Sequence, residues 1–519
     1  MKTKTSISRI LSLMLAAIIA AVSLTGCSGS GKRNVEGKTE IQIAYWQAGY
    51  GEEWLKAVID AFEKKYTDYY VNYQATASHA SVIAPFGMSD VDKNDLYLDI
   101  KNMDTQYMEP LDDILTATAD GDQKPLNEKM NQSYLAYEKS SDGKYYTLSY
   151  GGGIMGFYYN ADLLKKAGIT TFPRTTTELT AACDKLKGKN ITPLCHFKSG
   201  GYYSYLLQEY MAQYDGIDYY LNNFFACKAE NGTSPSKSVL TKKDGRYYAL
   251  KAIEKFVTPE YTLAGSNTMS HTEIQTQFIQ KSAAMMLNGN WVANEMKIDK
   301  SNKNIKCAKI PVLSAITDKL TTVKSDTDLR KVIDAVDSIT EGKKQLSDYA
   351  SGDSYSIDGL TVSAADWQKI YDARNTVVGN AAQQSLFIPK YSDSKEGAKK
   401  FVQFLLSDEG YAIYAKKTGC PLPLQMSTGK DVDTSKLSDM QKTPFETWKN
   451  ATIYVDSGVS SKHQIFASGG ADILAGVTFV SEFSTYNKND RKKADEIWSK
   501  VVKTVEEKYD IWLETMKGA

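Results

Sequence analysis

Three segments of the chain share one order of elements: a short apolar strand pattern, a loop with glycine and aromatic residues, and a helix pattern. They read IQIAYWQAGYGEEWLKAVIDAF from Ile41, ITPLCHFKSGGYYSYLL from Ile191, and SAAMMLNGNWVANEMK from Ser282. A strand, a loop and a helix in succession open an α/β unit, and ligands of such folds gather at the carboxyl ends of the strands. The repeated order therefore predicts an α/β fold whose ligand lies near these loops.

The first loop offers flat rings and a neutral amide to a ligand. Four residues lie at or next to the carboxyl end of its strand: Tyr45, Trp46, Gln47 and Tyr50. Tyr45 alternates in phase with Ile43 and is therefore also a candidate for the core, whereas Trp46 points to the other side. Glu52 and Glu53, in the first turn of the helix, complement its positive dipole end and would repel an anionic ligand. The loop favours a neutral ligand.

Three consecutive glycines stand between two short tyrosine-rich strand patterns, in KYYTLSYGGGIMGFYYN. Gly151–Gly153 predict a place where the chain crosses between domains or forms a hinge. Tyr150, directly before them, is a further candidate for ligand contact.

The strand and helix order is interrupted from Asp318 to about Gln384, where the chain becomes polar and mostly helical in pattern. We interpret residues 318–384 as an insertion. After it, the pattern predicts a strand and one long amphipathic helix, which begins at Asp393 and ends at Gly419.

The N-terminus has the pattern of an export signal. Basic residues precede an apolar run over residues 10–22, which is shorter than the about 20 residues that a membrane span needs. Leu24-Thr25-Gly26-Cys27 resembles the lipobox of bacterial lipoproteins, which predicts removal of residues 1–26 and a diacylglycerol on Cys27; the alternative is a plain signal peptide. Residues 27–39 would form a flexible tether. We therefore expect the protein on the extracellular side of the cell membrane, held there by its lipid.

Bulk composition sets few limits beyond size. Without residues 1–26 the chain has about 490 residues, more than one hydrophobic core supports, so two or more domains are expected. Basic and acidic residues number 62 each, which gives no indication of nucleic-acid binding. The other cysteines show no CxxC spacing and the four histidines no HExxH motif, so we expect neither a metal nor a cofactor, and disulfide pairing stays open. These cysteines are Cys183, Cys195, Cys227, Cys307 and Cys420.

The ordered set of segments resembles a known family. The lipobox is followed by IAYWQAGYGEEWLKAVIDAFEKKY, SYGGGIMGFYYNADLLKKAGI, FIQKSAAMMLNGNWVANEM and SDSKEGAKKFVQFLLSDEGYAIYAKKTGCPLPL. This order is similar to the carbohydrate-binding branch of the extracellular solute-binding proteins of ABC transporters, which includes maltose-binding protein. The chain departs from the family at Thr176, where members often have tryptophan, and residues 318–384 exceed the smaller members.

The resemblance implies two α/β lobes joined by crossing hinge strands, with the ligand in a cleft between them. Lobe 1 would comprise 40–152 plus 308–425, including the inserted segment, and lobe 2 would comprise 153–307 plus 426–519. It also implies that Tyr202, Tyr203 and Trp291 lie where family members stack rings on sugar. Independently, the C–H-rich face of a pyranose suits such rings, and its hydroxyls need neutral polar partners, which Asn288, Asn290 and Gln47 could supply.

The leading hypothesis is a monomeric binding protein that captures an oligosaccharide and delivers it to an ABC permease with a cytoplasmic ATPase, without chemistry of its own. A surface enzyme acting on polysaccharide is one alternative. A binding protein for a non-sugar solute such as a peptide is another, but it needs an arginine clamp, and the seven arginines are scattered.

Overall fold

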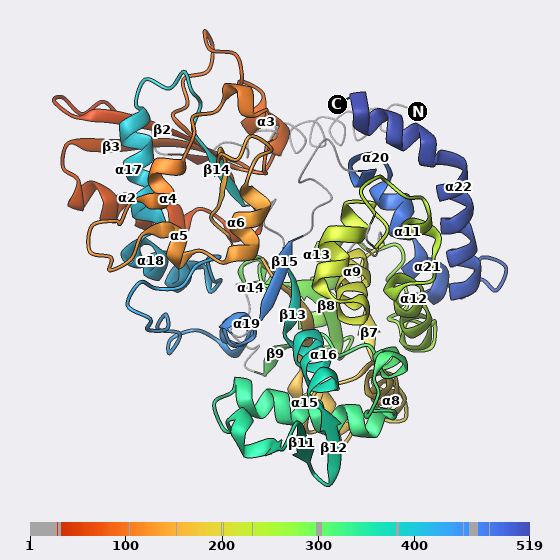
Figure 1. Cartoon of the computed structure of the whole chain (residues 1–519). Coiled ribbons are helices and arrows are strands. Elements are labelled where there is room, and N and C mark those ends of the chain that lie inside the picture. The colour runs from red at the N-terminus through yellow and green to blue at the C-terminus, as the bar shows by residue number, and fades with distance from the viewer. Residues whose placement is uncertain are drawn as a thin grey trace, which may run out of the picture.

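The computed structural model describes residues 28–29, 33–102, 104–151, 153–198, 200, 202–230, 232–296, 304–379, 384–449, 451–455, 465–476 and 478–518. The expected signal segment 1–26 and the expected lipid site Cys27 lie outside these residues. Two bodies stand side by side, lobe 1 on the left of Figure 1 and lobe 2 on the right, and each is built on its own sheet. The predicted two-lobed α/β fold is confirmed.

Lobe 1 is built on a six-stranded sheet in the order β1-β3-β2-β4-β14-β5. Its strands are β1 Ser28–Gly29, β2 Thr39–Trp46, β3 Tyr69–Thr76, β4 Leu96–Asp99, β5 Leu148–Ser149 and β14 Ser385–Phe387. β2, β3 and β4 run parallel, whereas β14 pairs antiparallel with β4, so a segment from late in the chain returns to this sheet. The carboxyl ends of β2 and β4 therefore lie next to each other.

The helices of lobe 1 cover this sheet (Figure 1). They are η1 Ala48–Tyr50, α2 Glu53–Lys65, α3 His79–Ile83, η2 Thr105–Tyr107, α4 Asp112–Thr116, α5 Leu126–Lys129, α6 Gln132–Glu138, α17 Lys395–Leu405 and α18 Asp408–Thr418. The apolar face of α2, with Leu55, Val58 and Phe62, is fully buried, as its helical spacing predicts.

Lobe 2 is built on a four-stranded sheet in the order β7-β8-β6-β9. Its strands are β6 Met155–Asn160, β7 Leu194–Cys195, β8 Met285–Gly289 and β9 Ile305–Ala308. Its helices are α7 Ala161–Lys166, α8 Thr176–Lys187, α9 Tyr202–Asp215, α10 Ile217–Tyr219, η3 Tyr220–Phe225, α11 Ser238–Thr241, α12 Gly245–Phe256, α13 His271–Ile279, α14 Val292–Glu295, α19 Asp439–Lys449, α20 Ile465–Ile473, α21 Phe479–Ser484 and α22 Ala494–Gly518.

Two crossing segments run together between the lobes. β13 Thr376–Gly379 forms an antiparallel bridge from Gly379 to Ile154, and the amide of Tyr150 donates to Gln384 O at 2.8 Å. A Cβ on Gly151 would lie 2.4 Å from Gln384 Cβ, so this glycine permits the close approach. β15 Thr452–Val455 adds to the other edge as a parallel partner of β13.

The inserted segment is mostly helical, as expected, but it also contains short strands that the pattern did not predict. It begins at the end of η4 Ser314–Lys319, and its helices are α15 Asp326–Thr340, η5 Leu346–Tyr349 and α16 Ala364–Asn375. Its strands β10 Ala350–Ser351, β11 Ser354–Ile357 and β12 Leu360–Ser363 form an antiparallel sheet. Its core of Leu329, Ile333, Trp367 and neighbouring apolar residues is separate from the main one. Each of these strands has only two to four residues, too few for their alternation to stand out from the polar segment around them.

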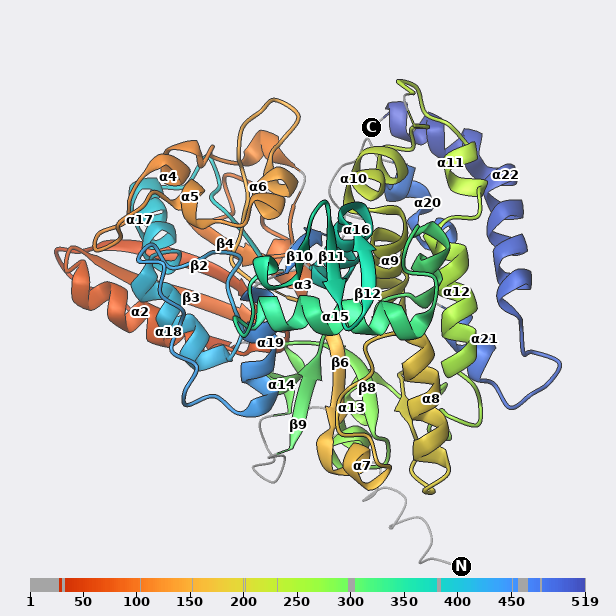
Figure 2. The ribbon, with the colours of Figure 1, turned by 60° about the horizontal axis from the view of Figure 1, so that its bottom comes forward.

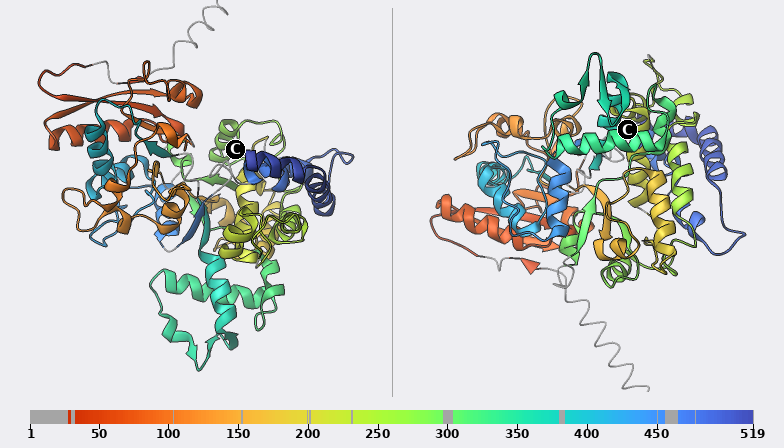
Figure 3. Two further views of the ribbon diagram at one scale, coloured as in Figure 1. Left: turned by 45° about the horizontal axis from the view of Figure 1, so that its top comes forward. Right: turned by 90° about the horizontal axis from the view of Figure 1, so that it is seen from below.

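The insertion is attached to lobe 2, although we expected it within lobe 1. η4 and α16 contact α9, and Arg330 of α15 pairs with Glu178 of α8 at 2.5 Å. Figures 2 and 3 show it projecting beside β9 and α8, in front of the lobes in Figure 2. The segment therefore has lobe 2 as its base.

Two further local expectations need correction. The predicted helix 393–419 is two helices, α17 and α18, because the Ser407 side chain caps α18 by accepting from Gly410 N. The predicted tether is partly fixed, because β1 pairs antiparallel with β3, and Arg33 NH2 donates to Val71 O at 2.6 Å. β3 is next to the edge of the sheet, and its unpaired backbone N–H and C=O groups are available to β1 and to Arg33.

Candidate functional site

The lobe 2 side of the candidate site is an aromatic pair. Trp291 follows the carboxyl end of β8 and caps α14, and Tyr202 is the first residue of α9. Their ring centroids lie 5.7 Å apart, and Trp291 Nε1 donates to the Tyr202 hydroxyl at 3.2 Å. Tyr202 also packs edge-on against Phe197. The structure thus brings together two residues that the sequence placed in separate loops.

The two asparagines beside this pair are buried and already hydrogen-bonded. Asn288 Oδ1 accepts from Gly289 N at 2.8 Å, and Asn290 Oδ1 accepts from Ile154 N at 3.3 Å. Asn290 therefore joins the turn before α14 to the first crossing segment. Both amides fix the backbone that carries Trp291.

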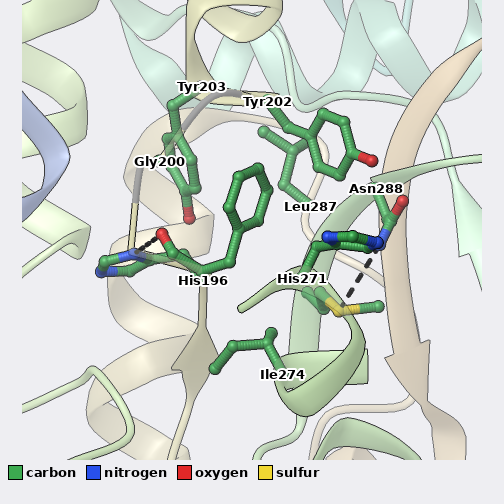
Figure 4. Close-up of a pocket in the computed structure, with 10 residues that line it drawn as sticks. His196, Gly200, Tyr202, Tyr203, His271, Ile274, Leu287 and Asn288 are labelled. Atoms are coloured by element: carbon green, nitrogen blue, oxygen red, sulfur yellow. Dashed lines mark hydrogen bonds between the residues drawn. The ribbon is translucent and has the colours of Figure 1, made fainter. Parts of the chain in front are cut away.

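Tyr203 lies behind the pair, in a small pocket of lobe 2 (Figure 4). The free volume of the pocket is about 10 Å³, room for about one water molecule and far less than the about 300–1,000 Å³ usual for ligand sites. The Tyr203 hydroxyl is buried and has no hydrogen-bond partner among the described residues, and Figure 4 shows the side chain pointing toward His196. Burial lowers the pKa of His196 to about 4, so this ring is neutral.

The lobe 1 side contains two groups that the sequence analysis missed. Asp99 ends β4 next to the end of β2, and His79 begins α3. His79 Nδ1 lies 2.8 Å from Asp99 Oδ1, and the Trp46 ring packs edge-on against His79. Burial raises the pKa of the Asp99 carboxyl, and the His79 contact partly offsets this rise. Only the sheet order, which sets β4 beside β2, could have indicated this cluster.

Trp46 and Gln47 are half-buried at the end of β2, whereas three other predicted site residues lie in the core. Trp46 Nε1 donates to Ala77 O at 3.1 Å, and Gln47 Nε2 donates to Glu52 Oε1 at 3.0 Å. Tyr45, Tyr50 and Tyr150 are 1%, 3% and 2% exposed. Tyr45 donates to Gly51 O at 2.5 Å, and its phase in the strand explains its inward position.

The two lobes meet where η1 contacts α14. A Cβ on Gly49 would lie 3.0 Å from both Trp291 Cβ and Glu295 Oε1. Glu295 Oε2 accepts from Gln275 Nε2 at 2.6 Å, and burial raises the pKa of its carboxyl although Gln275 and His271 partly offset this rise. Trp291 is only 7% exposed, because Gly289 and Tyr202 of its own lobe and Gly49 of the other lobe all pack against it.

Trp291, Asn290 and Glu295 lie where η1 of lobe 1 meets α14 of lobe 2. Trp46, His79 and Asp99 form a separate group at the carboxyl ends of β2 and β4. Rings and polar groups of this kind can hold a polyhydroxylated ligand by stacking and hydrogen bonding. Within the described ranges there is no group of three or more histidine, cysteine, aspartate or glutamate residues with metal-binding geometry. No described helix is both long and apolar enough to cross a membrane.

Comparison with known proteins gives a family match over most of the chain. The model of the family described as bacterial extracellular solute-binding protein matches residues 48–412. A binding protein of Brucella abortus (strain 2308) is 27% identical over 172 residues, which are 33% of this chain and 38% of that relative's length.

Solved structures share the fold at low sequence identity. The GacH receptor of Streptomyces glaucescens, also solved with acarbose, is 15% identical with a TM-score of 0.58 and covers 92% of this chain and 99% of its own. RafE from Streptococcus pneumoniae is 14% identical with a TM-score of 0.58, and the match covers 94% of this chain and 100% of RafE. A family 1 extracellular solute-binding protein from Bifidobacterium longum subsp. infantis is 16% identical with a TM-score of 0.52. This match covers 90% of this chain and 98% of that protein.

Proposed function

Because the chain belongs to the bacterial extracellular solute-binding protein family, we propose that it captures a neutral oligosaccharide between its lobes and delivers it to an ABC permease with a cytoplasmic ATPase. The observation that carries the proposal is the Tyr202–Trp291 pair at the carboxyl end of β8, where the two lobes meet. Stacked rings with neutral amides suit the apolar face and the hydroxyls of a pyranose. RafE, a relative in fold, has been solved with raffinose.

The charges of the described residues favour a neutral ligand over an anionic one. An acidic solute or a peptide carboxylate needs an arginine that is free to form a bidentate pair. Each arginine in the described ranges already pairs with a carboxylate. These arginines are Arg33, Arg174, Arg246, Arg330, Arg374 and Arg491. Glu295, which lies at the contact between the lobes, is a carboxyl and not a cation, so it offers no partner to an anionic ligand.

The proposed ligand set comes from both lobes. Lobe 2 supplies Trp291 and Tyr202, and lobe 1 supplies Trp46, His79 and Asp99. Asn288, Asn290 and Gln47 position these groups, and Tyr203 supports Tyr202 from behind; Tyr45, Tyr50 and Tyr150 support the lobe 1 loop and the crossing. A lipid on Cys27 would keep the monomer at the outer face of the membrane, near the permease.

The first experiment is a thermal-shift screen of the purified protein against neutral oligosaccharides. A ligand at 100 times its dissociation constant raises the free energy of unfolding by about 2.7 kcal/mol. Each hit is then incubated with the protein and assayed for new reducing ends. Binding without new ends supports the proposal, new ends favour a polysaccharide enzyme, and stabilisation by peptides alone contradicts the sugar assignment.

Trp291→Ala tests the aromatic pair, and Trp498→Ala is its matched control because Trp498 is 5% exposed within α22 of lobe 2. Both variants should lose about 3–5 kcal/mol of stability, since each deletes a buried ring. Only Trp291→Ala should weaken oligosaccharide binding by its folded fraction, by roughly thirty-fold for a loss of about 2 kcal/mol. Equal affinities of the two variants, measured by calorimetry, would remove Trp291 from the ligand set.

A further inference from the structure

Three chain segments of lobe 2 meet at the end of its sheet that lies opposite Trp291. Ala284 N donates to Thr192 O, and Asn160 N donates to Ala284 O, both at 2.9 Å. The end of β6 thus adjoins the starts of β7 and β8, whereas Trp291 follows the carboxyl end of β8. Figure 2 shows α7 and the end of α8 together at the bottom of lobe 2.

A cluster of exposed lysines, which we call the lysine edge, lies at this meeting point. It comes from the last turns of α7 and α8 and from the turns that follow α8 and α13. Its members are Lys165, Lys166, Lys185, Lys187, Lys189 and Lys281. None of these side chains forms an ion pair with a carboxylate in the described ranges; Lys187 Nζ lies 5.6 Å from the centre of the Tyr261 ring.

Part of the lysine edge forms an open groove with a free volume of about 370 Å³. Its lining residues are Asp162, Leu163, Lys165, Lys166 and Lys281. Asp162 Oδ2 already accepts from Asn304 Nδ2 at 2.8 Å. The three ammonium groups are therefore the charged groups of the groove that can take a partner from solution.

The ends of helices account for only part of this charge. α7, α8 and α13 all end at the lysine edge, and each end carries about half a negative elementary charge. Asp162 and Asp184 are the carboxylates of these segments, so the six lysines leave four positive charges. The three helix ends offset about one and a half of them. Lys281 also has φ +67°, a conformation that glycine adopts more readily.

We propose that the lysine edge is a docking surface for the anionic headgroups of a lipid membrane. It contains lysines and no arginine, and an ammonium group attracts phosphate as a point charge, whereas selection of one particular anion uses the planar fork of arginine. The charges also come from three segments and spread along one end of the lobe, which suits a surface better than a single small ligand.

The expected place of the protein supports the same partner. A lipid on Cys27 would keep lobe 2 beside a membrane at all times, and this point rests on the proposed membrane attachment. Docking itself can be tested without the lipid. It would leave the candidate sugar site free, because the lysine edge lies at the amino ends of β7 and β8, and Trp291 follows the carboxyl end of β8.

Vesicle sedimentation tests the proposal with the chain that begins at Ser28, which has neither signal segment nor lipid. This chain should bind vesicles of phosphatidylglycerol and phosphatidylcholine in equal amounts, and it should not bind vesicles of phosphatidylcholine alone. Binding should weaken as the salt concentration rises, because salt screens exposed charges. Absence of binding to the anionic vesicles, or equal binding to both kinds, would refute the proposal.

A groove variant and a control variant test the position of the contact. The groove variant is Lys165→Gln, Lys166→Gln and Lys281→Gln. Because each lysine near an anionic surface strengthens binding about fivefold, this variant should bind about a hundredfold more weakly. The control removes the same charge from exposed last turns of α2 and α18 in lobe 1 and should bind like the unchanged protein. It is Lys64→Gln, Lys416→Gln and Lys417→Gln. Equal weakening in both variants would show that net charge alone drives binding, and would refute the docking surface.

Lysine acetylation read by mass spectrometry locates the contact without any substitution. Anionic vesicles should protect Lys165, Lys166 and Lys281 from acetylation, while Lys416 and Lys417 should react as before. Inorganic phosphate at the same phosphate concentration should protect none of them. Equal protection by phosphate would assign the groove to a free anion and overturn the lipid assignment. None of these measurements uses a sugar, so they decide on the docking surface even if no oligosaccharide binds.

Discussion

Glu209 of α9 is a buried carboxyl whose ionisation should affect the stability of the protein. Its Oε2 accepts from Val378 N in the crossing strand β13 at 3.2 Å, and its Oε1 is buried without a partner in the described structure. Burial raises its pKa to about 8, although the Val378 amide and the charge of Arg374 partly offset this rise. The neighbouring Tyr210 is the other titratable group that senses its charge.

We expect Glu209→Gln to stabilise the protein in a pH-dependent way. A carboxyl whose pKa is raised by folding contributes most at low pH, and that contribution is lost as pH rises toward about 8. Glutamine keeps an acceptor for Val378 N but does not ionise, so the variant should gain on the order of 3 kcal/mol at pH 7 and little at pH 5. Urea unfolding at both pH values measures this; an equal effect at the two pH values would contradict it.

The position of Trp291 could be predicted from the sequence, but its burial could not. The run AAMML followed by NGNW places the indole at the carboxyl end of a strand, which the structure bears out. Its six-membered ring lies against Gly289, two residues earlier, but Tyr202 and Gly49, which also pack against Trp291, are far away in sequence, and no local pattern reports such contacts. Asp99 and His79 were missed for the same reason, because only the pairing of β2 with β4 brings Asp99 beside Trp46.

At the scale of elements, the insertion is fastened to lobe 2 through Asp337 of α15. Its carboxylate accepts from Arg374 Nε at 2.8 Å and from Arg374 Nη2 at 2.9 Å, and it pairs with Arg174 Nε at 2.8 Å. Burial alone would raise the pKa of Asp337, but Arg374 and Arg174 outweigh it and lower the pKa. Arg174 precedes α8, so the carboxylate links the two parts.

Asp337→Ala should therefore destabilise the protein by about 3–5 kcal/mol, because it leaves the buried Arg374 guanidinium without a counterion. Asp334→Ala is the matched control: its side chain is 48% exposed and lies 3.6 Å from Arg174, so its loss should cost less than about 1 kcal/mol. Denaturant unfolding compares the two. Similar losses would show that this ion pair does not anchor the insertion.

Helix ends were easier to predict than the number of helices. Asn160 caps α7 and Gly419 ends α18 in the left-handed conformation, as their residue types indicate. The break at Ser407 was missed because apolar residues continue through it at helical spacing. The three strands of the insertion were missed because they are short: β10 has two residues, and the alternation of SYSI in β11 and LTVS in β12 extends over only four residues each.

At the scale of the whole molecule, attachment to the membrane should depend on one residue. Cys27→Ala should leave the chain unprocessed or shed it into the medium, because the predicted lipid has no other attachment point in the lipobox pattern. Detergent phase partitioning of cells that produce each protein measures this. Unchanged protein recovered from the aqueous phase would contradict the lipid anchor.

The five cysteines beyond Cys27 are all buried as free thiols. Burial raises the pKa of the thiols of Cys183, Cys195, Cys227 and Cys307. Because maleimide dyes react with accessible thiolates, they should not label the folded chain from residue 28 onward. A single cysteine added at the surface, such as Leu346→Cys in the insertion, would then be the only labelling point. The protein is thus suited, without removal of its own cysteines, to become a one-dye optical reporter of its ligand.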